Sequence, residues 1–109
     1  MDWLDEVTRE LERAAAAEQS GNSGKVRTSA RRAVGIALME LQRRFPEKNY
    51  GRDFLSQLRC FAADNSVPEE ARLAADRLQA RLSPQFESLS KHPIDDAKSI
   101  IRFVMDRLA

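Results

Sequence analysis

Few side chains in this chain of 109 residues are of the types that usually act as catalytic nucleophiles or bases or bind zinc. It contains one histidine, His92, and one cysteine, Cys60. A lone His and a lone Cys cannot form a zinc site of the usual His/Cys type, and nothing in the sequence orients His92 as a base toward Cys60. Cys60 stands beside Phe61 and is expected to be a small apolar filler. We therefore expect no catalytic residue, no metal and no cofactor, and a non-enzymatic protein is favoured.

His92 is the one imidazole of the sequence, the side chain most often used as a general acid or base. It stands between Lys91 and Pro93 at the expected start of a helix, which favours an exposed or cap-adjacent imidazole over a functional one. The neighbouring carboxylates Asp95 and Asp96 suit a helix N-terminus through its dipole, without any catalytic role. The run GNSGK at 21–25 lacks the spacing and the preceding strand of a phosphate-binding loop.

The basic residues of the stretch 23–45 are the other candidates for a site. At 100° per residue, Ile36 and Met39 fall nearly opposite the main apolar stripe of this helix, on a face shared with Lys25, Arg32 and Arg43. We call these five residues the outward strip, and Arg31 lies to one side of it. The candidate binding residues are thus Lys25, Arg31, Arg32, Ile36, Met39 and Arg43. A mixed basic and apolar face can bind RNA, an acidic protein or a copy of itself, but no aromatic residues interleave for base stacking.

Hydrophobic periodicity predicts helices to position these residues. The expected ranges are about 2–19, 23–44 and 53–63, a helix from a capping box at 66–69 to about 82, a short helical turn at 84–90, and a helix at 93–108. No strand pattern occurs. The prediction is an all-α fold, an antiparallel (up-and-down) bundle of four to five helices in a single domain, 1–109.

The expected core follows from the apolar stripes. Small residues at Ala30, Ala33 and Ala37 form a ridge that allows close helix approach. The residues expected to face inward also include Phe54, Leu55, Leu58, Phe61, Ala62, Leu78, Leu82, Phe86, Leu89, Ile101, Val104 and Met105. Ile100 and Phe103 lie off the apolar stripe of the expected helix 93–108, just as Ile36 and Met39 lie off the stripe of the expected helix 23–44. This surplus of apolar surface predicts a second contact face.

The charge balance limits the partners. The net charge of +1 gives no general case for nucleic-acid or membrane binding. Residues 1–20 carry a net charge of −4 and residues 21–44 a net charge of +5, which favours two neighbouring helices of complementary charge over a basic ligand site. The lone cysteine fits a reducing compartment, and neither a signal peptide nor an apolar run of about 20 residues is present. We therefore expect a cytoplasmic protein without membrane contact.

The order of features resembles the HEPN domains, small helical-bundle modules of prokaryotes. The resemblance rests on the first helix, on RRAVGIALMEL at 31–41 and on HPIDDAKSIIRFVMDRL at 92–108. Many HEPN domains are toxin ribonucleases with an Arg, a polar residue beside it and, after four to six residues in all, a His. The nearest Arg before His92 is Arg81, with ten residues between them. The resemblance therefore implies a member without that active site.

The hypothesis from the sequence is a module that acts by protein contact, as a homodimer or with a helical or nucleotidyltransferase-like partner protein. The motivation is the surplus apolar surface. One alternative is binding of RNA or a nucleotide through the basic helix 23–44. Another is a degenerate toxin-type ribonuclease that uses His92.

Overall fold

The computed structural model describes residues 2–85 and 87–109, and this part of the chain is all-helical, without strands. The five helices are α1 (Trp3–Gln19), α2 (Ser23–Arg44), α3 (Phe54–Ala62), α4 (Glu69–Gln79) and α5 (Pro93–Leu108). The predicted bounds of α2 and α5 are confirmed. The all-α class is confirmed with them.

Side chains at the helix starts explain several of these bounds. The Asn22 side chain accepts a hydrogen bond from the Lys25 N–H at 3.1 Å, and Asp53 accepts one from the Ser56 N–H at 2.9 Å. The capping box predicted at 66–69 is wrong, because α4 starts after Pro68 without a side-chain cap. The Ser66 hydroxyl donates to Asp64 at 2.7 Å instead.

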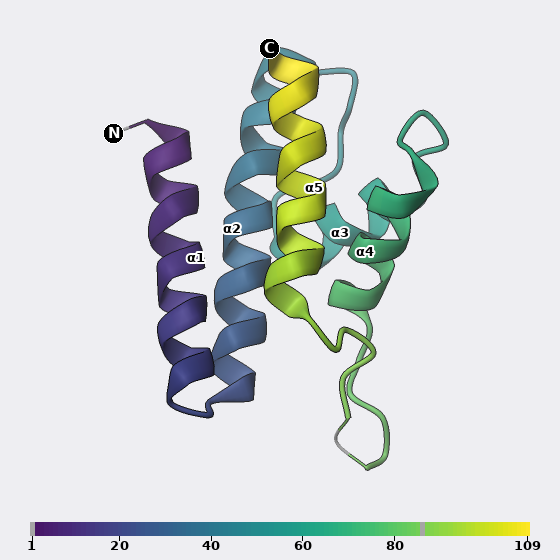
Figure 1. Ribbon diagram of the computed structural model, residues 1–109. Helices are drawn as coiled ribbons and strands as arrows, with labels where there is room; N and C mark the ends of the chain where they lie inside the picture. Colours follow the sequence, from purple (N-terminus) through teal and green to yellow (C-terminus); the bar gives the residue numbers. More distant parts are fainter. Residues whose placement is uncertain (1, 86) are drawn as a thin grey trace.

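α1, α2 and α5 lie side by side, and α4 follows next to α5 (Figure 1). α3 packs on both α2 and α4. The turn between α1 and α2 contains Gly21 in the left-handed region, with φ 75°, and makes the two helices antiparallel neighbours. α2 and α5 run in the same direction in Figure 1, so the structure does not confirm a simple up-and-down order.

The core centres on α2. Ala30, Ala33 and Ala37 are fully buried, which confirms the predicted ridge of small residues. Ile100 is also fully buried, and Phe103 packs edge-on against Phe61 with ring centroids 5.6 Å apart. Ile100 is therefore covered within the chain, whereas Phe103 is only partly buried.

Several residues predicted to face inward are exposed instead. They are Phe54, Leu55, Leu82, Leu89 and Met105, together with Cys60, which was expected to be a small apolar filler. α4 ends at Gln79, which leaves Leu82 outside the helix. Among the described residues of 84–90 no helix is present, although residues 84–85 form a turn, and Leu89 is 60% exposed. Phe86, expected to face inward, lies outside the described residues.

Candidate functional site

The structure divides the six predicted binding residues among different surroundings. Ile36 is half-buried and Met39 is 46% exposed, and both border an open groove between α1, α2 and α3. Arg43 lies at one end of this groove. Lys25 is in the first turn of α2, far along the helix from Ile36. The outward strip is therefore not one continuous site.

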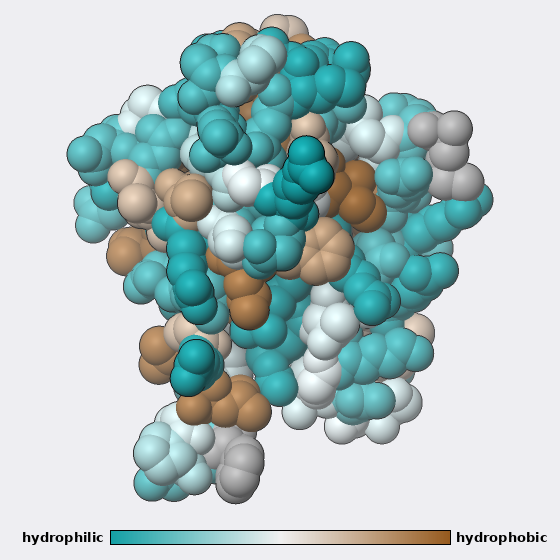
Figure 2. Space-filling view, turned by 180° about the vertical axis from the view of Figure 1, so that it is seen from behind, coloured by the Kyte–Doolittle hydropathy of each residue, from teal (hydrophilic) through white to brown (hydrophobic). Residues whose placement is uncertain are grey.

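The groove has a volume of about 600 Å³ and apolar walls. Trp3 comes from α1, Ile36 and Met39 come from α2, and Phe54 comes from α3. Polar groups stand among them, and the complete lining is Trp3, Glu6, Gly35, Ile36, Met39, Glu40, Gln42, Arg43 and Phe54. We refer to this hollow as the α1–α2–α3 groove. Figure 2 shows the face on which α3 lies, where apolar side chains gather in separate spots among hydrophilic ones.

Gly35 determines how closely α3 approaches the groove. A Cβ atom at Gly35 would lie 2.1 Å from Phe54 Cδ1, far inside van der Waals contact. The absence of that atom lets the Phe54 ring lie directly on the α2 backbone, although the ring is still 38% exposed. A glycine inside a helix costs about 1 kcal/mol relative to alanine. The close contact with Phe54 explains why glycine nevertheless occupies position 35.

The buried side-chain amide of Gln57 lies beside the contact between Phe54 and Gly35. Gln57 is fully buried, and its Nε2 donates to the Gly51 carbonyl at 3.2 Å and to the Arg52 carbonyl at 3.3 Å. Its Oε1 has no hydrogen-bond partner among the described residues. That oxygen lies 3.2 Å from where a Gly35 Cβ would stand. The amide thus fixes the loop before α3 and leaves one acceptor free next to the groove.

Arg43 is paired within its own helix. It donates to both oxygens of Glu40, at 3.0 and 2.5 Å, and Arg44 donates to Glu40 at 2.9 Å. The hydrogen bond from Arg43, helped by Arg44 and opposed by burial, lowers the pKa of Glu40 to about 2. Two arginines around one carboxylate leave only a small excess of positive charge at this end of the groove.

Arg31 has a structural role that its sequence position did not show. Its Nε donates to the Leu78 carbonyl at 2.6 Å, and its Nη2 donates to the Ala80 carbonyl at 3.4 Å. These carbonyls belong to the C-terminal end of α4, where a cation also complements the helix dipole. Burial, and to a lesser extent the charge of Arg27, lower the pKa of Arg31. Arg31 joins α2 to α4, whereas Arg32 next to it is exposed.

The acidic and basic helices do not pair directly. Within residues 2–85 and 87–109 no ion pair joins α1 to α2. Glu10 bonds instead to Arg13 of its own helix, at 2.6 Å. The predicted charge complementarity of these helices is therefore at most a long-range effect.

His92 occupies the N-cap position of α5, where it is exposed and forms no side-chain cap. This agrees with the structural interpretation of the imidazole. The neighbouring Asp96 has a role that the sequence did not suggest. It is buried and accepts from Arg77 of α4 at 2.7 and 3.2 Å, and from the Ser90 hydroxyl at 2.6 Å. This carboxylate ties α4 and the following loop to α5.

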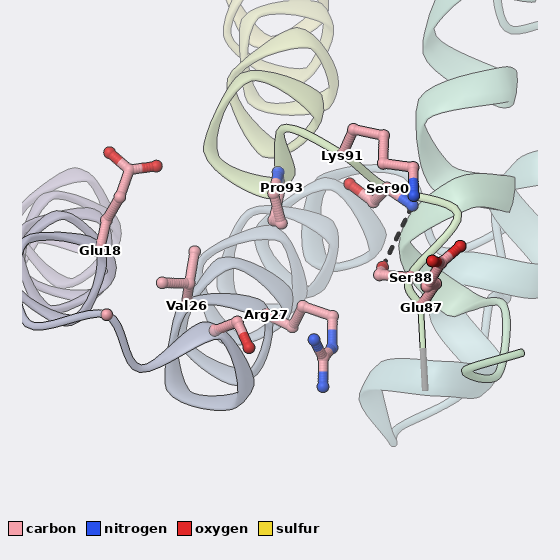
Figure 3. Close-up of a pocket in the computed structure, with 10 residues that line it drawn as sticks. Glu18, Val26, Arg27, Glu87, Ser88, Ser90, Lys91 and Pro93 are labelled. Carbon is pink, nitrogen blue, oxygen red and sulfur yellow. Dashed lines mark hydrogen bonds between the residues drawn. The ribbon is translucent and has the colours of Figure 1, made fainter. Parts of the chain in front are cut away.

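A second hollow, of about 390 Å³, lies where the start of α2 meets the segment before α5 (Figure 3). Arg27 and Lys91 line it, but so do Glu18 and Glu87, so its charges cancel. The dashed line in Figure 3 marks the hydrogen bond from the Ser90 N–H to the Ser88 hydroxyl, at 3.2 Å. Balanced charge gives this hollow no preference for a particular ligand.

A polar cluster joins the loop after α2 to the turn between α3 and α4. Asp64 accepts from the Tyr50 hydroxyl at 2.5 Å, from Lys48 Nζ at 2.9 Å and from the Ser66 hydroxyl at 2.7 Å. Burial alone would raise the pKa of Asp64, but these three hydrogen bonds together lower it well below its usual range. Burial, and then the Asp64 carboxylate, raise the pKa of Tyr50 far above its usual value. No local sequence pattern predicts this cluster, because its residues come from two separate segments.

Neither the comparisons nor the arrangement of side chains points to a known activity. The sequence matches no family model, and no curated protein or solved structure is significantly similar to it. In the part of the chain that the structure describes, no three His, Cys, Asp or Glu side chains are grouped to hold a metal ion. None of the described helices combines the length and apolar character needed to cross a membrane.

Proposed function

We propose that the protein is a non-enzymatic helical module that acts by protein contact, and that it forms a homodimer through the α1–α2–α3 groove. The observation that carries this proposal is the groove itself. It gathers Trp3, Ile36, Met39 and Phe54 from three helices around one opening. An aromatic and aliphatic cluster at the centre of a polar surface is the usual composition of a protein contact site.

The charges along α2 support a second copy as the occupant. In an antiparallel crossing of two α2 helices with Ile36 at the two-fold axis, residues four positions before and after it face each other across the axis. Arg32 of one copy then lies opposite Glu40 of the other, and the same pair occurs twice. Arg32 is exposed and makes no ion pair within the described residues, whereas Glu40 already accepts from Arg43 and Arg44, so the pair across the interface requires Glu40 to exchange one of these arginines for Arg32 of the other copy.

The size of the chain is compatible with such a contact. A stable interface buries about 800 Å² on each partner, which is roughly an eighth of the 6640 Å² surface of this chain. The groove supplies only the centre of this area, so the polar residues around it must contribute the rim. A dimer of moderate affinity, in the micromolar range, is expected.

Sedimentation equilibrium at 1–100 micromolar protein tests the proposal. We expect a monomer–dimer equilibrium that Met39→Lys shifts toward monomer by at least tenfold in Kd. Met105→Lys is a matched control, because Met105 is 45% exposed and Met39 46%, and Met105 does not line the groove. A clean monomer at 100 micromolar, or equal effects of the two variants, would refute the proposal.

Other expectations from the sequence stay predictions. Some HEPN domains form homodimers through bundle faces, which would agree with the proposed dimer, and a cytoplasmic location belongs to the same hypothesis. We do not propose nucleic-acid binding, because Arg31 is bonded to the end of α4 and Arg43 is paired with Glu40. His92 is exposed, and although Glu18, Asp95 and Lys98 line the same hollow, none of them forms an ion pair with the imidazole within the described residues, so we do not propose a ribonuclease.

A further inference from the structure

The polar cluster around Asp64 borders a cavity that is separate from the α1–α2–α3 groove. The cavity has a volume of about 290 Å³ and lies among the end of α2, the loop after it, the turn before α4 and the end of α5. Its lining residues are Leu41, Phe45, Lys48, Tyr50, Ser66, Val67, Phe103 and Arg107. It is close to the smaller end of the range for ligand sites, roughly 300 Å³.

One side of this cavity is apolar and firmly built. Leu41 and Val67 are almost completely buried, and Phe103 is fixed edge-on against Phe61. Tyr50 also packs edge-on against Phe61, with ring centroids 5.9 Å apart. An apolar group of a ligand would meet side chains that are already held in place, which lowers the entropic cost of binding.

The other side carries positive charge. Lys48 Nζ donates to Asp64 and to Ser66, at 2.9 and 2.5 Å, which leaves its third hydrogen free. Arg107 lies over the Phe45 ring, with its guanidinium carbon 4.2 Å from the ring centroid. Within residues 2–85 and 87–109 the Arg107 guanidinium forms no hydrogen bond and no ion pair.

The cluster gives the cavity a net positive charge. Lys48 and Asp64 cancel each other, whereas Arg107 remains uncompensated. An arginine fork beside a lysine hydrogen matches the two oxygens of a carboxylate. The apolar residues of the same lining match a short hydrocarbon or aromatic body.

We propose that this cavity binds a small carboxylate with an apolar body, whose carboxylate is held by Arg107 and Lys48 and whose body rests on Leu41, Val67 and Phe103. This inference does not depend on the proposed dimer, because none of these residues lines the α1–α2–α3 groove.

The test is a titration of the isotope-labelled protein with benzoate, followed by amide chemical shifts. We expect benzoate at millimolar concentration to shift the amides of residues 45–50, 66–67 and 103–107 in a saturable way. Acetate, which has no apolar body, and benzyl alcohol, which has no charge, should each bind at least fivefold more weakly. Tight binding of acetate or of benzyl alcohol would overturn the assignment of one half of the site.

Two variants of α5 decide whether the charge acts as proposed. Arg107→Gln should weaken benzoate binding by about tenfold, as expected for the loss of one charge-assisted hydrogen bond. Arg102→Gln is the matched control, since Arg102 is exposed on the same helix but does not line the cavity. Equal affinities in the two variants, or no shifts at the cavity amides with the wild-type chain, would overturn the proposal.

Discussion

Truncation of Asp64 to alanine should strongly destabilise this protein, because four donors lose their shared acceptor: the Tyr50 hydroxyl, Lys48 Nζ, and the hydroxyl and N–H of Ser66. Tyr50 is buried, and its hydroxyl would remain without a partner beside Phe61. Lys48 and Ser66 would also lose their bonds to the carboxylate. A buried unsatisfied group costs about 1–3 kcal/mol, and a hydrogen bond to a charged group contributes about 1.5–3 kcal/mol. We expect Asp64→Ala to lower the free energy of unfolding by about 3 kcal/mol.

The companion variant Tyr50→Phe should cost less, about 1 kcal/mol. It removes one donor, and the Asp64 carboxylate keeps Lys48 and Ser66 as partners. In the Tyr50→Phe background, Asp64→Ala no longer leaves a hydroxyl without a partner. The double variant should therefore be more stable than the sum of the single effects predicts, with a coupling energy of about 1–2 kcal/mol.

Urea unfolding followed by circular dichroism at pH 7 measures all four proteins. Asp76→Ala serves as a control, because Asp76 is exposed on α4 and its side chain bonds, among the residues that the structure describes, only to Gln79 of the same helix, so its effect should stay within about 0.5 kcal/mol. A coupling energy below about 0.5 kcal/mol, with Asp64→Ala no worse than Asp76→Ala, would refute the reasoning.

The pH dependence of the same proteins gives an independent check. The folded-state pKa of Asp64 is lowered, so its contribution is complete above the unfolded pKa of about 3.9. That contribution falls as the pH drops below this value toward the folded pKa. The stability difference between the wild type and Asp64→Ala should therefore shrink between pH 5 and pH 2. The pKa of Tyr50 is raised, so its contribution should fall only above about pH 10.

Two further predictions compare neighbouring or matched residues. Gly35→Ala should destabilise the protein by about 1–2 kcal/mol, because the overlap with Phe54 outweighs the gain in helix propensity, whereas Gly24→Ala, with no atom closer than 3.8 Å, should be neutral or slightly stabilising. Equal thermal shifts for the two glycine variants would count against the close approach of α3. Arg31→Gln should cost about 1–2 kcal/mol and Arg32→Gln less than about 0.5 kcal/mol in the monomer, measured by urea unfolding at low protein concentration. The opposite order would mean that Arg31 does not hold the end of α4.

The long helices could be predicted from the sequence because their signals are local. In α2 and α5 the apolar spacing, the Asn22 cap and Pro93 at the first position all lie within a few residues of the bound that they set. In the nine-residue helix α3 the stripe is too short to determine which way the helix is turned. Leu55 and Cys60 were accordingly expected inside and lie outside.

The polar contacts could not be predicted, because their partners come from separate segments. Lys48 and Tyr50 lie in the loop after α2, and Asp64 and Ser66 lie in the turn before α4. Their distance in space depends on how α3 folds back, which no local pattern specifies. The same holds for Asp96, whose partner Arg77 is nineteen residues away. A carboxylate at a helix start satisfies the dipole rule whether or not a distant arginine reaches it.

Adjacent arginines on α2 show why a run of basic residues is a poor guide to a binding site. Arg31 and Arg32 differ by one position, or about 100° around the helix. That rotation places Arg31 against the carbonyls at the end of α4 and leaves Arg32 in solvent. The net charge of the helix is the same in either case, but only the exposed arginine can meet a partner. The more informative signal was Gly35, because a glycine that interrupts a helix of strong formers needs a packing reason. Here the reason is the Phe54 ring, which lies on the backbone at Gly35 and forms part of the α1–α2–α3 groove.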